Sequence, residues 1–219
     1  MPYRRTPRVQ ARLDAQRELL LESAVRLLAE RGYAGCSVAA VAAEAGVAIG
    51  SVYRHFPSKA ELVAELFRRV VEREVAAVEQ ASTSASGVTE RVTAVIETFA
   101  NRALKTPRLA YALLAEPVDA PVEQQRLVFR QAFRDVVAAR ITEGVTAGVL
   151  PPQDANISAA ALVGAIAEVM IGPLTAESAD ADVIPALCTF AAQALGGGTL
   201  SPNTPTTPPV TGGSHVTHP

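Results

Sequence analysis

The chain has 219 residues, of which 49% are hydrophobic but only 5% aromatic. Ala, Val and Leu therefore supply most of the apolar mass, a composition that favours closely packed helices. There is no run of about 18 uncharged apolar residues, and the Arg-rich N-terminus lacks the apolar stretch of a secretory signal. We therefore expect a cytoplasmic, nucleoid-associated protein without a membrane segment. Cys36 and Cys188 form no C-x-x-C pair, and neither a metal nor a cofactor is expected.

The charge is distributed unevenly along the chain. The net charge is −2, yet residues 1–60 hold nine Lys/Arg against five Asp/Glu, and the remainder holds eleven against seventeen. A basic N-terminal part on an acidic body is the asymmetry expected when one end of a protein faces phosphates.

The predicted elements are all helical, because apolar residues recur at helical spacing and no strand-like alternation occurs. Gly and Pro mark most of the breaks, and Ser58 with Glu61 forms a capping box. The predicted helices span about 13–31, 38–45, 49–55, 58–80, 89–105, 108–115, 122–146, 155–171 and 183–195. The predicted parts are a flexible basic arm (1–12), a helix-turn-helix domain (13–57), a ligand-binding and dimerisation domain (58–196) and a disordered tail (197–219).

Residues 38–55 have the pattern of two short helices crossing at a steep angle. Ala42 supplies a small residue at the crossing, and Gly46 tolerates the left-handed φ of the turn. The positions predicted to point inward are Val41, Ala45, Val47 and Val52. The positions left facing outward on the second short helix are Ala48, Ile49, Gly50, Ser51, Tyr53 and Arg54. Such a small face suits close approach to DNA.

The stretch around these helices closely resembles the N-terminal domain of TetR-family regulators. The shared residues are Ala24, Leu28, Gly32 and Tyr33 at a helix end, Ala42, Ala45, Gly46 and Val47 at the turn, Gly50, Ser51, Val52, Tyr53, His55 and Phe56 in the recognition helix, and Ser58 with Lys59 after it. Ala48 departs from the Ser or Thr frequent at the head of that helix, so one hydrogen bond is expected to be missing.

The resemblance implies a DNA-contacting set. It comprises Ser37, Ala48, Ile49, Gly50, Ser51, Tyr53, Arg54, His55 and Lys59. Tyr53 and His55 would mainly touch phosphates, and Lys59 would add its charge to a phosphate contact at the next helix N-terminus. Each has a plainer alternative: a half-buried tyrosine, a surface histidine and a solvated lysine. The arginines of the arm either reach an adjacent groove or only keep the arm soluble.

The body is expected to dimerise and to bind a small molecule. One helix-turn-helix domain covers few base pairs, so such proteins bind DNA as symmetric dimers. The candidate dimer residues, which could also serve packing within one chain, are Ala160, Ala161, Gly164, Ala165, Leu187, Phe190 and Ala191. The candidate ligand pocket, each member of which could be plain core, comprises Phe99, Leu109, Tyr111, Leu114, Phe129, Phe133, Val137 and Met170. Few charges occur there, which favours an apolar or amphipathic ligand.

The sequence therefore predicts a ligand-responsive DNA-binding transcriptional regulator. It would bind a palindromic operator in double-stranded DNA as a homodimer, act as a repressor, and be released by an unidentified small-molecule effector. No catalytic motif is found, so an enzyme is not expected. Two alternatives stay open: a thiol-based redox sensor acting through Cys36, and an architectural DNA-binding protein without an effector.

Overall fold

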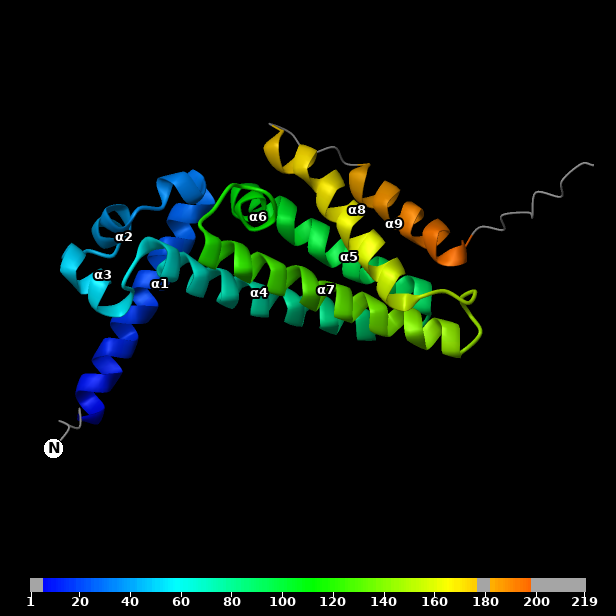
Figure 1. Ribbon diagram of the computed structural model, residues 1–219, viewed down its shortest axis with the longest axis horizontal. Coiled ribbons are helices and arrows are strands. Elements are labelled where there is room, and N and C mark those ends of the chain that lie inside the picture. The colour runs from blue at the N-terminus through cyan, green and yellow to red at the C-terminus, as the bar shows by residue number, and fades with distance from the viewer. Residues whose placement is uncertain (1–5, 177–181, 198–219) are drawn as a thin grey trace, which may run out of the picture.

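The computed structural model describes residues 6–176 and 182–197, and within these ranges the fold is all-α, as predicted (Figure 1). The helices are α1 (Pro7–Gly35), α2 (Val38–Glu44), α3 (Ile49–His55), α4 (Lys59–Ser84), α5 (Val88–Lys105), α6 (Pro107–Leu114), α7 (Ala120–Thr146), α8 (Ala155–Thr175) and α9 (Val183–Ala192), which a π-helical turn (Gln193–Gly197) follows. The predicted bounds of α2 to α7 agree with these to within a few residues.

The first helix starts earlier than the sequence predicted. Residues 7–12, expected to belong to a flexible arm, form the first turns of α1. Pro7 stands in the first turn of α1, where its missing N–H costs no hydrogen bond and its fixed φ suits a helix. At the other end, Gly32 has φ 66° and ψ −173°, which interrupts the helix one turn before Gly35. Residues 1–5 and 198–219, which include nearly all of the predicted tail, lie outside the described residues.

The end of α8 also differs from the prediction. The helix was expected to stop at Ile171, before Gly172 and Pro173, but it continues to Thr175. Pro173 removes a single backbone donor, while Leu174 is buried in the core, and its packing offsets that loss. The N–H of Ala176 still donates to the carbonyl of Gly172 at 3.0 Å, which closes the last turn.

The described residues form two hydrophobic cores. The head core holds buried residues of α1, α2, α3 and the first half of α4, from Leu62 to Val70. The body core holds residues of α5, α7, α8 and α9, together with the second half of α4, from Val71 onward. The fourth helix therefore belongs to both cores, and the predicted division after residue 57 cuts through the head core rather than between the two.

Helix α6 lies between the two cores. Leu109, Ala112 and Leu113 are buried in the head core, while Ala110 and Leu114 are buried in the body core. In Figure 1 the head of α1, α2 and α3 stands at one end of the molecule, with α4, α5 and α7 running away from it and α8 and α9 along one side. Through α6, the packing of the head depends directly on the packing of the body.

Helix α8 is both long and apolar, with a mean hydropathy of 1.9. Among the described helices it alone has the length and apolar composition needed to cross a membrane, although a core helix can pass the same test. Most of the helix is not buried within the chain, since Ile157 is 69% exposed and Val169 is 46% exposed. This exposed apolar face makes α8 a candidate interaction surface.

Candidate nucleic-acid interface and ligand cavity

The two short helices of the head are held by caps, a glycine turn and a small apolar core. Ser37 caps α2, since its hydroxyl accepts from the backbone N–H of Ala40 at 3.1 Å. Gly46 has φ +66°, the left-handed conformation predicted for the turn. The N–H of Val47 donates to the carbonyl of Ala42 at 2.9 Å, and Val52 anchors α3 with no exposed surface.

The outer face of α3 is exposed and combines large with small residues. Tyr53 is 51% exposed and Ile49 is 49% exposed, although both are large side chains with apolar surface. A Cβ added at Gly50 would meet nothing within 4 Å, so the backbone itself is accessible there. Ala48 stands at the N-cap without a side-chain hydrogen bond, which leaves backbone N–H groups at the start of α3 available to an anion.

Two of the predicted DNA contacts are engaged within the protein. Nε2 of His55 lies 3.1 Å from Oε1 of Gln16 on α1. The ammonium of Lys59 donates to the carbonyl of Tyr33 at 2.8 Å and lies 3.8 Å from the centre of the Tyr33 ring. Both side chains fix the head in this conformation, and their contact with phosphate stays a prediction.

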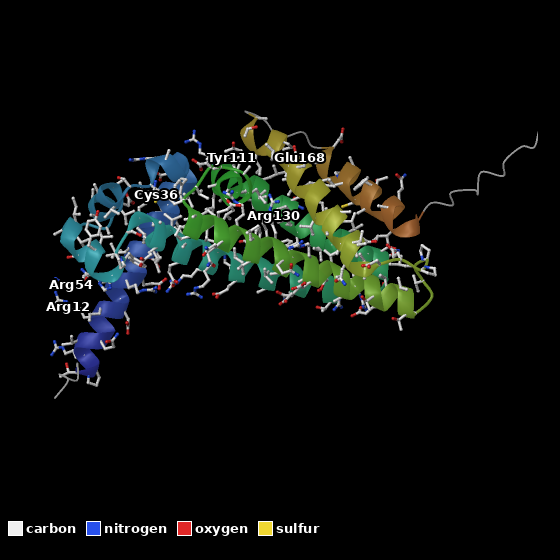
Figure 2. The ribbon with its side chains drawn as sticks, in the orientation of Figure 1. Arg12, Cys36, Arg54, Tyr111, Arg130 and Glu168 are labelled. Atoms are coloured by element: carbon white, nitrogen blue, oxygen red, sulfur yellow. The ribbon has the colours of Figure 1, made fainter. Side chains whose placement is uncertain are left out.

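Further positive charge lies on α1. In Figure 2, Arg12 projects from the part of α1 that extends beyond the head, and Arg54 lies on α3 at the same end of the molecule. Arg8 and Arg12 are exposed on this helical extension. The basic charge that the sequence assigned to a flexible arm is therefore carried partly by a rigid helix.

The head is joined to the body at the break in α1. The carboxylate of Glu116, in the link between α6 and α7, accepts from the backbone N–H of Tyr33 at 2.8 Å and of Ala34 at 3.4 Å. The Tyr33 hydroxyl donates to Asp119, and burial together with this carboxylate raises the pKa of Tyr33. More than 80 residues separate the partners in sequence, so sequence reasoning missed this junction.

Arg126 holds the other side of the same link. Its side chain is buried and donates to the carbonyls of Leu113 at 2.9 Å, Ala112 at 3.0 Å and Glu116 at 2.6 Å. These bonds satisfy carbonyls at the C-terminal end of α6, which otherwise have no helical partner. Burial lowers the pKa of Arg126, but the contacts with carbonyls and with Glu123 suit the charged form.

The body core encloses a small apolar cavity of about 30 Å³. Its lining residues are Val95, Ile96, Phe99, Leu114, Phe129, Arg130, Phe133, Val137, Val163 and Ile166. Phe133 packs edge-to-face against Phe99 and Phe129, with ring centres 5.1 and 4.7 Å apart. Ligand pockets measure roughly 300–1,000 Å³, so these rings must move before a ligand can enter.

The lining differs in part from the predicted pocket. Phe99, Leu114, Phe129, Phe133 and Val137 lie on it as predicted, whereas Tyr111 and Met170 pack in the body core without reaching it. Leu109 belongs to the head core and lines a separate small cavity beside the first. Sequence reasoning missed the further lining residues of α5 and α8, which are Val95, Ile96, Val163 and Ile166. The helical spacing of Val95 with Phe99 and of Val163 with Ile166 could have indicated them.

A family model for "Bacterial regulatory proteins, tetR family" matches residues 20–66, the segment that builds the helix-turn-helix head. Residues 20–66 therefore form a TetR-type helix-turn-helix domain. The transcriptional repressor KstR2 of Mycobacterium tuberculosis is 44% identical over 61 residues, which cover 28% of this chain and 30% of KstR2. The transcriptional activator FasR of Mycolicibacterium smegmatis is 34% identical over 86 residues, 39% of each chain. The chain thus spans less than two fifths of the length of these relatives.

A solved structure extends the likeness to the body. The regulator FadR from Bacillus subtilis, in complex with stearoyl-CoA, superimposes with a TM-score of 0.71 over 82% of this chain and 98% of FadR. The sequence identity is 20%, so the likeness concerns the fold. The helical body described above is therefore the body of a TetR-type fold.

The predicted dimer face needs a correction. Leu187 and Ala191 of α9 are buried in the chain's own body core, so neither can form an interface. Their neighbour Phe190 is 47% exposed, and the predicted residues of α8 are exposed (Ala161, Gly164) or half-buried (Ala160, Ala165). Because one face of α9 is buried against α5, the faces left uncovered for a candidate interface are those of α8 and the opposite side of α9. Ile157 and Val169 are also exposed on α8 and were not among the predicted residues.

Cys36 has no reactive environment in this TetR-type head. Its side chain is fully buried, and burial raises the pKa of the thiol to about 11 despite the positive charge of Lys59. A redox-sensing cysteine needs an accessible thiolate. The structure therefore gives no support to the thiol-sensor alternative.

Proposed function

We propose that this chain is a ligand-responsive transcriptional regulator that binds a palindromic site in double-stranded DNA as a homodimer. The observation that carries the proposal is the outer face of α3, where Tyr53 and Ile49 are about half exposed beside an open Gly50. Folding leaves these large side chains in water although Val52, on the same helix, is fully buried. A recognition helix that enters the major groove needs this arrangement.

The basic residues around α3 would supply the sequence-independent part of the affinity. Arg54 lies on α3, and Arg8 and Arg12 lie on the extension of α1. Neutralising phosphates releases counterions, so the affinity should fall steeply as salt rises. This proposal places the protein in the cytoplasm, at the nucleoid.

Repression is the proposed outcome of binding. The KstR2 relatives are named as repressors, and FasR, which matches a longer segment at lower identity, is named as an activator. A dimer on a palindrome blocks access to the DNA by occupancy alone, whereas activation needs a further contact. For that reason repression is the simpler function for this chain.

The effector would be a small molecule with an extended apolar part. The cavity is lined by apolar side chains except for Arg130, and it lies in the body core. FadR from Bacillus subtilis holds stearoyl-CoA, and another similar chain is named as a fatty acid metabolism regulator. We propose that an acyl chain opens the same region of this body by displacing the three phenylalanine rings.

Recovery and sequencing of genomic fragments bound by the purified dimer at physiological salt would test this function. We expect enrichment of one or a few palindromic sites and loss of that enrichment for Tyr53→Ala. Binding to all fragments alike would instead favour an architectural DNA-binding protein. No enrichment from a folded protein, with or without added acyl compounds, would contradict the proposal.

A further inference from the structure

Arg130 is the charged residue among those that line the cavity. Arg126, one turn earlier on α7, already has its partners within the chain. Its guanidinium donates to three carbonyls and forms an ion pair with Glu123. Arg130 forms no ion pair with any residue in 6–176 or 182–197, and its one hydrogen bond is a long one, 3.4 Å, to the carbonyl of Leu114. Arg130 lines the cavity but is an exposed residue, so its guanidinium lies at the mouth of the cavity rather than inside it. Figure 2 labels Arg130 on α7.

Leu114 connects this arginine to the junction with the head. Its side chain lines the cavity, its carbonyl accepts from Arg130, and it is the last residue of α6. Leu113, beside it, is buried in the head core. Two residues further on, the carboxylate of Glu116 holds the backbone N–H groups of Tyr33 and Ala34. A displacement of Leu114 is therefore transmitted over a very short stretch of chain to the end of α1.

Resting on the proposed function, we propose that Arg130 selects an effector with an anionic head on its apolar chain and that Leu114 transmits its binding to the Glu116–Tyr33 junction. A hydrogen bond from an arginine to a carboxylate or phosphate is charge-assisted and stronger than one to a carbonyl. The head group therefore draws Arg130 away from Leu114. The apolar chain displaces Leu114 from the cavity side at the same time. The hydrogen bonds from the Tyr33 and Ala34 amides to the carboxylate of Glu116 then break.

The selectivity is tested by calorimetric titration of the full chain with dodecanoate, dodecanoyl-CoA and dodecan-1-ol. We expect the wild type to bind at least one of the two anions about tenfold more tightly than the alcohol. Arg130→Gln should bind all three alike. Arg134→Gln is the matched control, because Arg134 lies one turn further along α7, donates to Gln131 and does not line the cavity. It should keep the wild-type preference.

The coupling is tested by amide hydrogen exchange at the junction, which needs no known operator. With the preferred anion bound, exchange of the Tyr33 and Ala34 amides should accelerate at least fivefold in the wild type and in Arg134→Gln. In Arg130→Gln saturated with the same compound, the acceleration should be clearly smaller, because only the apolar chain then acts on Leu114. Glu116→Ala should exchange rapidly with or without ligand.

The outcomes separate this inference from the proposed function. Binding of none of the three compounds would remove the acyl effector itself and the inference with it. Equal binding of anions and alcohol, or a preference that survives in Arg130→Gln, would overturn Arg130 as the selecting residue while the effector stands. Selective binding with unchanged exchange at Tyr33 and Ala34 would overturn the coupling. A preference for dodecanoyl-CoA alone would show that Arg130 recognises the phosphates of the head group. A preference for dodecanoate alone would show that it recognises the carboxylate.

Discussion

At the scale of single residues, neighbouring positions of α3 have different roles, as Val52 and Tyr53 show. Val52 is fully buried and holds α3 on the head core, whereas its neighbour Tyr53 is half exposed. The two roles follow from the angle of about 100° between successive residues of a helix. Exposed residues such as Tyr53 add little to the free energy of unfolding, so their effect on DNA binding can be measured separately from folding.

We predict that Tyr53→Ala lowers the affinity for the selected operator at least tenfold without unfolding the protein. Exposed substitutions usually change stability by less than about 0.5 kcal/mol. Binding is measured by fluorescence anisotropy and folding by circular dichroism. A well-folded variant with wild-type affinity would remove Tyr53 from the interface.

The buried thiol of Cys36 makes a prediction about pH. Its pKa is raised from 9.0 to about 11, so the folded state favours the protonated thiol more than the unfolded state does. That stabilisation is complete below pH 9 and is lost as the pH rises toward 11, by on the order of 2 kcal/mol. In urea titrations from pH 8 to 11, Cys36→Ala should therefore lose less stability than the wild type. Parallel pH profiles of the two proteins would contradict this account.

At the scale of elements, the helix-turn-helix depends on two glycines that do different work. Gly46 has φ +66° and Gly50 lies within α3, yet a Cβ at either position would meet nothing within 4 Å. An added methyl group would therefore clash with no neighbour at either glycine, and the two positions differ only in backbone conformation. This makes the pair a controlled comparison within one motif.

Gly46→Ala should lower the free energy of unfolding by about 1–2 kcal/mol, because an L residue is strained in the left-handed region. Gly50→Ala should raise it by about 0.5–1 kcal/mol, since alanine is the better helix former. The second variant should nevertheless bind DNA more weakly, because its methyl group lies on the face that approaches the groove. Urea unfolding and anisotropy measure both quantities, and equal stability changes would refute the backbone argument.

Helix α6 is the element on which the proposed regulation depends most. One of its faces is buried in the head core and the other in the body core, and its last carbonyls are held by Arg126. A helix of eight residues with two buried faces cannot shift on one side without disturbing the other. The proposed coupling needs no long chain of contacts for this reason.

At the scale of the whole molecule, the uncovered apolar face of α8 is the proposed site of dimerisation. Ile157, Ala161, Gly164 and Val169 are exposed on one helix, and a Cβ at Gly164 would meet open space. The same small residues that predicted close helix packing are thus unpacked in the single chain. A second copy of the chain that covers these residues of α8 would also place two helix-turn-helix domains on one DNA.

We predict that Ile157→Glu converts the dimer to a monomer and abolishes binding to a palindromic operator. Leu127→Glu on α7 is the matched control, since Leu127 is 58% exposed against 69% for Ile157. Both variants should fold, and only the first should change its mass in sedimentation velocity. A dimeric Ile157→Glu protein would move the interface away from α8.

Much of the fold could be predicted because its signals are local. Ser37, Gly46 and the Ser58–Glu61 box fix helix ends through bonds within a few residues, and the spacing of apolar residues fixes which helices form. The same local spacing gave the outward face of α3 and the resemblance to TetR-family heads. Burial within the chain agreed with these predictions for Val41 and Val52.

Only the tertiary structure decided what depends on contacts between distant segments. The junction of Glu116 with Tyr33, the buried Arg126 and the place of Arg130 at the cavity mouth join residues on different helices, and no spacing in the sequence encodes such a pairing. Helical periodicity shows that a residue is apolar on one face, but not which neighbour covers that face. Leu187 and Ala191 therefore turned out to be core rather than interface, because α5 had already covered them.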